Sequence, residues 1–65
     1  MFTKTKLGKK QKVTLPELRK VLNNDVRNTD WFGMVTEEEL VKHLINDIKD
    51  GQRYTSDGYL YEYVA

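Results

Sequence analysis

Apolar residues recur at helical spacing in two stretches of the chain. The first stretch covers residues 13–28, where positions three and four apart form one apolar stripe of Leu15, Leu18, Val21, Leu22 and Val26. Thr14 stands in front of this stripe as an N-cap, and Glu17 follows three residues later as its capping-box partner. The pattern therefore predicts an amphipathic helix that ends between Asp25 and Asn28.

The second stretch has the same signature and a clearer end. Its stripe consists of Leu40, Val41, Leu44, Ile45 and Ile48. Thr36 is the predicted N-cap, and Glu39 closes the capping box. Gly51 suits the left-handed position just past a helix C-terminus. We therefore predict a second helix between Thr36 and Gly51.

The last fifteen residues predict a β-hairpin. Asp57-Gly58 favours a two-residue type I′ turn, which places Tyr54 opposite Tyr61. In that register all four tyrosines share one face, and Arg53 opposes Glu62 on the other. A three-residue loop, 56–58, would instead move Tyr54 to the opposite face. We prefer the shorter loop because it unites the aromatic rings and pairs opposite charges.

Two roles are open for this tyrosine face. It is either one wall of a small core, packed under the helices, or an exposed binding platform. Tyrosine suits a thin core because its ring packs while its hydroxyl group reaches water.

The first twelve residues carry a different pattern. Residues 2–7 alternate apolar or threonine positions with lysine, which fits either an edge strand protected by lysines or a loose basic arm. We therefore divide the chain into this segment, 1–12, and one compact domain, 13–65. The predicted fold class is α+β: two amphipathic helices packed on a C-terminal antiparallel hairpin, with Phe2–Leu7 or Lys12–Thr14 as a candidate third strand.

The order of a short strand, two helices and a hairpin resembles the last part of a winged-helix domain. The resemblance covers residues 11–65 at the level of the fold, through "VTLPEL", "TEEELVKHLINDI" and "GQRYTSDGYLYEYV". It implies DNA binding in a regulatory role, with the hairpin as the wing.

Composition narrows the function classes. The chain has 65 residues, no cysteine and one histidine, so it offers neither a disulfide framework nor a thiolate metal site. The sequence places no serine or cysteine nucleophile near His43. We therefore expect no enzymatic activity, no bound metal and no cofactor. The sequence also lacks an apolar run long enough for a membrane span and the apolar centre of a signal peptide. A cytoplasmic protein that does not contact membranes is the expectation.

Charge divides the chain into two halves. Residues 1–28 contain eight Lys or Arg against two acids, a balance of +6, and residues 29–65 contain three against eight, a balance of −5. A basic half of this kind is typical of proteins that contact phosphate. The predicted nucleic-acid contacts are Lys4, Lys6, Lys9, Lys10, Lys12, Arg19, Lys20, Arg27 and Arg53. The acids at 37–39 would repel phosphate, so the basic segment and first helix are better candidates than the second helix.

A protein partner is the alternative. A small accessory protein of the phage or mobile-element type, which inhibits or modulates a host protein, would use an acidic helix face and exposed aromatic anchors. The candidate contacts are Trp31, Phe32, Glu38, Glu39, Asp47, Asp50, Tyr59 and Tyr61. Oppositely charged halves also suit an antiparallel homodimer, which would bury apolar area that a lone chain of this size lacks.

Overall fold

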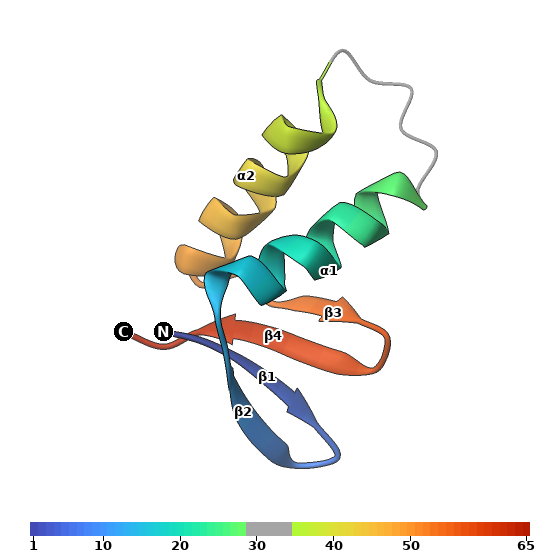
Figure 1. The fold of residues 1–65 in the computed structure, drawn as a ribbon. Helices are drawn as coiled ribbons and strands as arrows, with labels where there is room; N and C mark the ends of the chain where they lie inside the picture. The colour runs from blue at the N-terminus through green and yellow to red at the C-terminus, as the bar shows by residue number, and fades with distance from the viewer. Residues whose placement is uncertain (29–34) are drawn as a thin grey trace.

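A computed structural model describes residues 1–28 and 35–65 (Figure 1). The chain runs through two strands, two helices and two further strands. These are β1 (Phe2–Lys6), β2 (Lys9–Val13), α1 (Leu15–Arg27), α2 (Glu37–Lys49), β3 (Tyr54–Ser56) and β4 (Tyr59–Tyr63). The α+β class and the two helices are confirmed. The sheet has four strands, drawn from both ends of the chain, where two or three were expected.

The four strands form one antiparallel sheet in the order β2-β1-β4-β3. The two hairpins therefore meet along β1 and β4, where Phe2 lies opposite Tyr63 and Thr5 opposite Leu60. The chain ends are joined at the same place, because the N-terminal ammonium group donates a 2.8 Å hydrogen bond to the Val64 carbonyl oxygen. The segment expected to be an arm or an edge strand thus supplies a central strand, β1, and the edge strand β2.

The C-terminal hairpin follows the shorter of the two predicted loops. Asp57 and Gly58 have φ angles of 52° and 82°, as a type I′ turn requires. Tyr54 pairs with Tyr61, and the tyrosines share one face of the sheet. The two-residue turn is therefore confirmed.

Both helices begin as the sequence predicts. The Thr14 hydroxyl oxygen accepts a hydrogen bond from the Glu17 backbone N–H at 3.3 Å, and Thr36 accepts one from Glu39 at 3.2 Å. Helix α2 ends in a Schellman motif, because the Gln52 N–H donates to the Asp47 carbonyl oxygen and the Gly51 N–H to that of Ile48. Gly51 is the left-handed residue this motif needs, with φ 103°.

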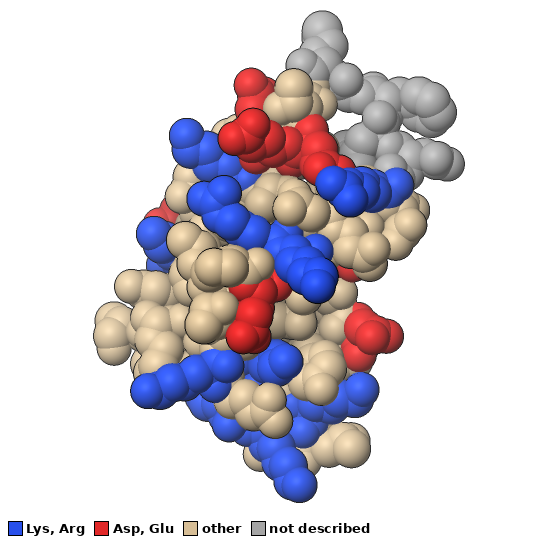
Figure 2. All heavy atoms as spheres, in the orientation of Figure 1, with Lys and Arg blue, Asp and Glu red and all other residues tan. Residues whose placement is uncertain are grey.

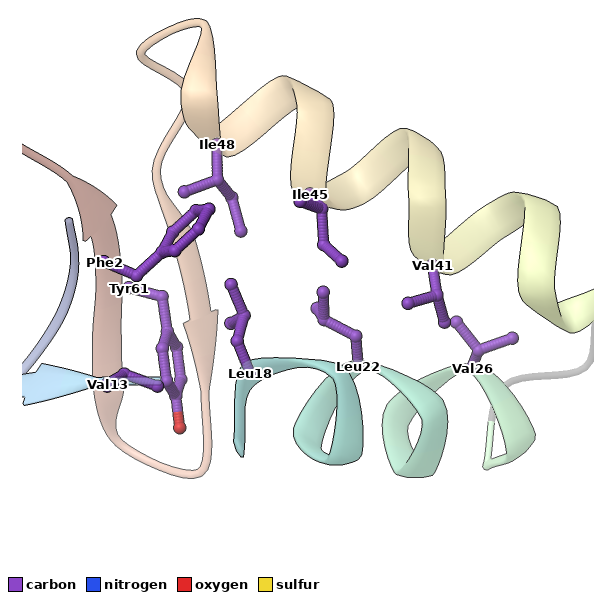
Figure 3. Close-up of a cluster of buried hydrophobic side chains, with 9 residues drawn as sticks. All are labelled: Phe2, Val13, Leu18, Leu22, Val26, Val41, Ile45, Ile48 and Tyr61. Atoms are coloured by element: carbon purple, nitrogen blue, oxygen red, sulfur yellow. The ribbon is translucent and has the colours of Figure 1, made fainter. Parts of the chain in front are cut away.

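Helices α1 and α2 pack on one face of the sheet, where they enclose the core (Figure 3). The core lies between the two helical stripes and the end of the sheet where the chain termini meet. Its buried members are Phe2, Val13, Leu18, Leu22, Val26, Val41, Ile45, Ile48 and Tyr61.

The tyrosine face is mainly core wall. Tyr61 is 4% exposed, and Tyr54 and Tyr59 are half-buried against the core cluster. Tyr63 is 39% exposed and meets the Phe2 ring edge-on, with 5.0 Å between ring centroids. The tyrosine-rich tail is thus chiefly architecture.

Candidate nucleic-acid interface

The β1–β2 hairpin is closed by a tight turn at Leu7 and Gly8. Their φ angles are 51° and 79°, so both central residues occupy the left-handed region, as in a type I′ turn. Lys6 and Lys9 flank this turn and lie directly opposite each other. Two lysines therefore occupy directly opposite positions of the ladder, where like charges are unfavourable.

The register distributes five lysines over both faces of the sheet. We call this set the hairpin lysines: Lys4, Lys6, Lys9, Lys10 and Lys12. Lys4, Lys6 and Lys9 share the face of Phe2 and Val13, which carries the helices farther along. Lys10 and Lys12 stand on the opposite face, across from Thr5 and Thr3 respectively. Positive charge thus lies on both faces of the N-terminal hairpin.

The hairpin lysines have no acidic partner within the described residues. The ion pairs found there are Arg27–Glu37, at 2.7 Å between Nε and Oε1, and Arg53–Glu62, at 3.7 Å. Four of the five hairpin lysines are exposed and Lys4 is half-buried. Figure 2 shows Lys and Arg side chains gathered over β1 and β2, and acidic side chains near the start of α2. On the face shown, basic side chains therefore cover the N-terminal hairpin.

Tyr59 orients two of these lysines. The ammonium nitrogens of Lys4 and Lys6 lie 5.0 and 4.8 Å from the centroid of its ring, within cation–π range. A small hollow of about 220 Å³ opens beside this group, and its lining includes Lys6, Leu7, Lys9 and Tyr59. The half-buried ring therefore holds two cations on the helix-bearing face of the hairpin.

A larger groove runs between α1 and the C-terminal hairpin. Its volume is about 680 Å³, and Lys20 and Tyr59 are among its lining residues. Asp25 and Asp57 also line it, so its charges are mixed. The Tyr54 hydroxyl group donates a 2.7 Å hydrogen bond to Asp25, and burial followed by this bond raises the pKa of Tyr54 well above its ordinary value. This tie fixes α1 to β3 and gives the groove a structural role.

The other cations expected at the interface differ in availability. Arg19 and Lys20 are exposed on α1. Arg27 is held by Glu37 through two hydrogen bonds, of 2.7 and 3.3 Å, and the hydrogen bond followed by the charge of Glu37 raises the pKa of Arg27. Arg53 faces Glu62 as the register predicted. The two paired arginines are therefore partly neutralised, and the hairpin lysines are not.

The residues predicted for a protein partner are scattered. Trp31 and Phe32 lie outside the described residues, and Tyr61 is buried in the core, where it offers no surface to a partner. Tyr59 lies beneath two lysines. The acids of this set are exposed along α2: Glu38, Glu39 and Asp47, with Asp50 at its C-cap. What is left of this surface is acidic, with no described aromatic anchor beside it.

Sequence reasoning passed over Leu7. Its side chain is 95% exposed at the tip of the hairpin. The signal was the short stretch "KLGK", whose turn the sequence analysis did not predict. An apolar residue between lysines at a turn is the feature that could have marked it.

The described residues contain neither a metal-ligating cluster nor a membrane-spanning helix. In residues 1–28 and 35–65, no three potential metal-ligating side chains cluster together. No helix in these ranges has the length and apolar character needed to cross a membrane. His43 is exposed on α2.

Comparisons with protein-family models, with curated proteins and with solved structures gave no match. The function is therefore argued from the surface chemistry alone.

Proposed function

We propose that this protein binds nucleic acid, with the hairpin lysines contacting the phosphate backbone. The observation that supports this most is that the five cations of the N-terminal hairpin have no carboxylate partner among the described residues. Lys6 and Lys9 are even placed opposite each other. A polyanion relieves this repulsion, whereas water only screens it.

The strands also support the proposal, because they fix the backbone from which the lysine side chains project. A disordered arm loses conformational freedom when it binds, and that loss weakens affinity. Lysine stems rooted in paired strands have already lost the backbone part of that freedom. Each phosphate they neutralise releases counterions, which makes binding strongly dependent on salt.

The proposal moves the interface away from the wing that the winged-helix resemblance implied. The C-terminal hairpin packs against β1 through β4, and its Arg53 is paired with Glu62. The first residues of α2 are acidic, and Glu37 holds Arg27. The N-terminal hairpin therefore takes the role first given to the wing, with Arg19 and Lys20 of α1 as flanking contacts.

The test measures binding to a random-sequence duplex by fluorescence anisotropy at a series of salt concentrations. Five neutralised phosphates give a slope of log affinity against log salt of about −4.5, at about −0.9 per contact. Changing Lys6, Lys9 and Lys10 together to glutamine should reduce the magnitude of the slope by about 2.7, at about 0.9 for each lost contact. The matched control changes Lys42 and Lys49 on α2 to glutamine, which should leave it unchanged. If the unaltered protein shows no salt-sensitive binding at low salt, the proposal is wrong.

A protein partner at α2 is the second candidate. It is favoured by the exposure of four acids along this helix and its C-cap, none of them in an ion pair within the described residues. Reversing the charge of Glu38 and Asp47 should abolish recovery of a partner in a pulldown while leaving nucleic-acid binding intact. Unchanged recovery would exclude this surface.

A further inference from the structure

Leu7 combines two features that stability alone does not favour. Its side chain is 95% exposed, the largest exposure among the exposed apolar residues of the described chain. Its backbone lies at φ 51°, in the left-handed region, where a residue with a Cβ atom is disfavoured. Asparagine, aspartate or glycine is the usual residue at this position of a type I′ turn.

Its surroundings suggest what such a residue contacts. Leu7 sits between Lys6 and Lys9 at the tip, and hairpin lysines stand on both faces of the sheet behind it. The hairpin thus has an exposed apolar residue at its tip and cations on both faces behind the tip. This arrangement suits a groove whose base is less charged than its two anionic sides. The grooves of a nucleic-acid duplex have this composition, with base edges at the floor and phosphates along both sides.

We propose that the β1–β2 hairpin enters the major groove of a DNA duplex with Leu7 against the base edges. The inference rests on the proposed function and names its ligand. Lys4, Lys6 and Lys9 then face the phosphates of one wall, and Lys10 and Lys12 those of the other.

The distribution of charge selects this ligand over the alternatives. A flat anionic surface such as a membrane meets one face of a sheet, which leaves either Lys10 and Lys12 or the other three lysines unused. The major groove of B-DNA, about 12 Å wide, admits a two-stranded ribbon, whereas the minor groove is about half as wide. The major groove of duplex RNA is deep and narrow, so side chains do not reach its bases.

The decisive variant is Leu7→Asn. Asparagine tolerates the left-handed backbone, so the variant keeps the turn and its fold. We expect its affinity for duplex DNA to fall about tenfold, because a buried leucine contact is lost, while the salt slope stays the same. The matched control is Leu7→Met, which keeps an apolar side chain and should bind within about twofold of the unaltered protein. Lys9→Gln should instead reduce the magnitude of the salt slope by about 0.9, because it removes one phosphate contact.

The outcomes separate this inference from the function on which it rests. If Leu7→Asn binds the duplex as tightly as the unaltered protein, with the salt dependence intact, groove entry is overturned and phosphate binding stands. If the unaltered protein shows no salt-sensitive binding, both are overturned. Equal Leu7 dependence on single-stranded DNA or duplex RNA would also overturn groove entry.

Two further measurements locate the hairpin. Bound protein should protect guanine N7, which lies in the major groove, from methylation by dimethyl sulfate. Protection confined to adenine N3, in the minor groove, would contradict the proposal. Vesicles containing phosphatidylserine test the membrane: if Leu7→Asn loses vesicle binding while its duplex binding is unchanged, the leucine serves a lipid surface and the inference is wrong.

Discussion

The two hairpins of this sheet have the same turn geometry. Each is closed by a two-residue turn whose central residues both have positive φ, Leu7-Gly8 in one and Asp57-Gly58 in the other. Each supplies one inner strand and one edge strand, so the order β2-β1-β4-β3 places them side by side. The two turns also lie at the same end of the sheet, because a Cβ atom added at Gly58 would lie 3.5 Å from the Lys6 Cε atom.

The side chains of the two hairpins differ in their expected effect on stability. In the C-terminal hairpin, aspartate and glycine fit the turn, Tyr61 enters the core and Arg53 faces Glu62. In the N-terminal hairpin, a leucine occupies the left-handed position and Lys6 meets Lys9. One hairpin is therefore built from residues that stabilise the fold, while the tip of the other carries residues that cost stability. That contrast is what points to the N-terminal tip as the functional part of the sheet.

The largest effect expected from breaking this contrast is at Tyr61. Tyr61→Ala removes a core side chain and should destabilise the protein by about 3–5 kcal/mol. Such a loss approaches the whole stability of a domain of this size, about 3–10 kcal/mol. Gln11→Ala lies in the same cross-strand row, beyond Lys4, and is exposed, so its effect should stay within about 0.5 kcal/mol. Urea denaturation followed by circular dichroism measures both, and similar losses for the two variants would contradict the division of roles.

The difference between the hairpins also explains how much of the fold the sequence predicted. Both helices and the C-terminal hairpin carry local signals: N-cap threonines, a glycine past α2 and the Asp57-Gly58 turn. The N-terminal hairpin was not predicted because the first central residue of its turn is a leucine, where asparagine, aspartate or glycine is usual. The pairing of β1 with β4 joins opposite ends of the chain, and no local pattern encodes a contact of that range.

The candidate site was predictable in its charges and not in its arrangement. Lysines appear in the composition whatever the fold, and the opposition of Arg53 and Glu62 follows from the turn. The pairing of Arg27 with Glu37 needs the two helices to be packed, and it removes a cation from the interface. The cation–π contacts of Tyr59 need β4 beside β1. For Arg27 and the hairpin lysines, only the tertiary structure distinguishes paired from unpaired cations.

A second, smaller effect concerns the tie between α1 and the C-terminal hairpin. Tyr54→Phe removes the hydrogen bond to Asp25 and should cost about 1 kcal/mol near neutral pH, since the bond reaches a charged group but is only half-buried. The folded state raises the pKa of Tyr54, so the protonated hydroxyl stabilises it below the ordinary tyrosine pKa of about 10, and this contribution is lost as pH rises above that value. The difference in urea midpoint between the unaltered protein and Tyr54→Phe should therefore shrink above about pH 10. A difference that grows with pH would contradict this sign.

A third change should stabilise the protein. Leu7→Asn relieves the left-handed leucine and should raise stability by about 1 kcal/mol, or about 4–8 °C in melting temperature for a domain of this size. Asp57→Leu is the matched reverse change in the other hairpin and should lower stability by a similar amount. Thermal denaturation of both variants checks the pair. If Leu7→Asn is destabilising instead, the exposed leucine contributes to the fold and the contrast between the hairpins is smaller than the structure implies.

The smallest effect tests the repulsion at the tip directly. Lys9→Glu replaces a like-charge pair by an opposite one across from Lys6 and should stabilise the protein by about 0.2–1 kcal/mol at low salt. Lys10→Glu makes the same charge change on the other face, across from Thr5, and controls for the general effect of lowering net charge. The advantage of the Lys9 variant over the Lys10 variant should fade as salt screens the pair. Both variants should bind nucleic acid more weakly than the unaltered protein. A Lys9 variant that gains stability as it loses binding would show that the repulsion at this tip is kept for a ligand, whereas equal stability of the two variants would show that Lys6 and Lys9 splay far enough apart to cost the fold nothing.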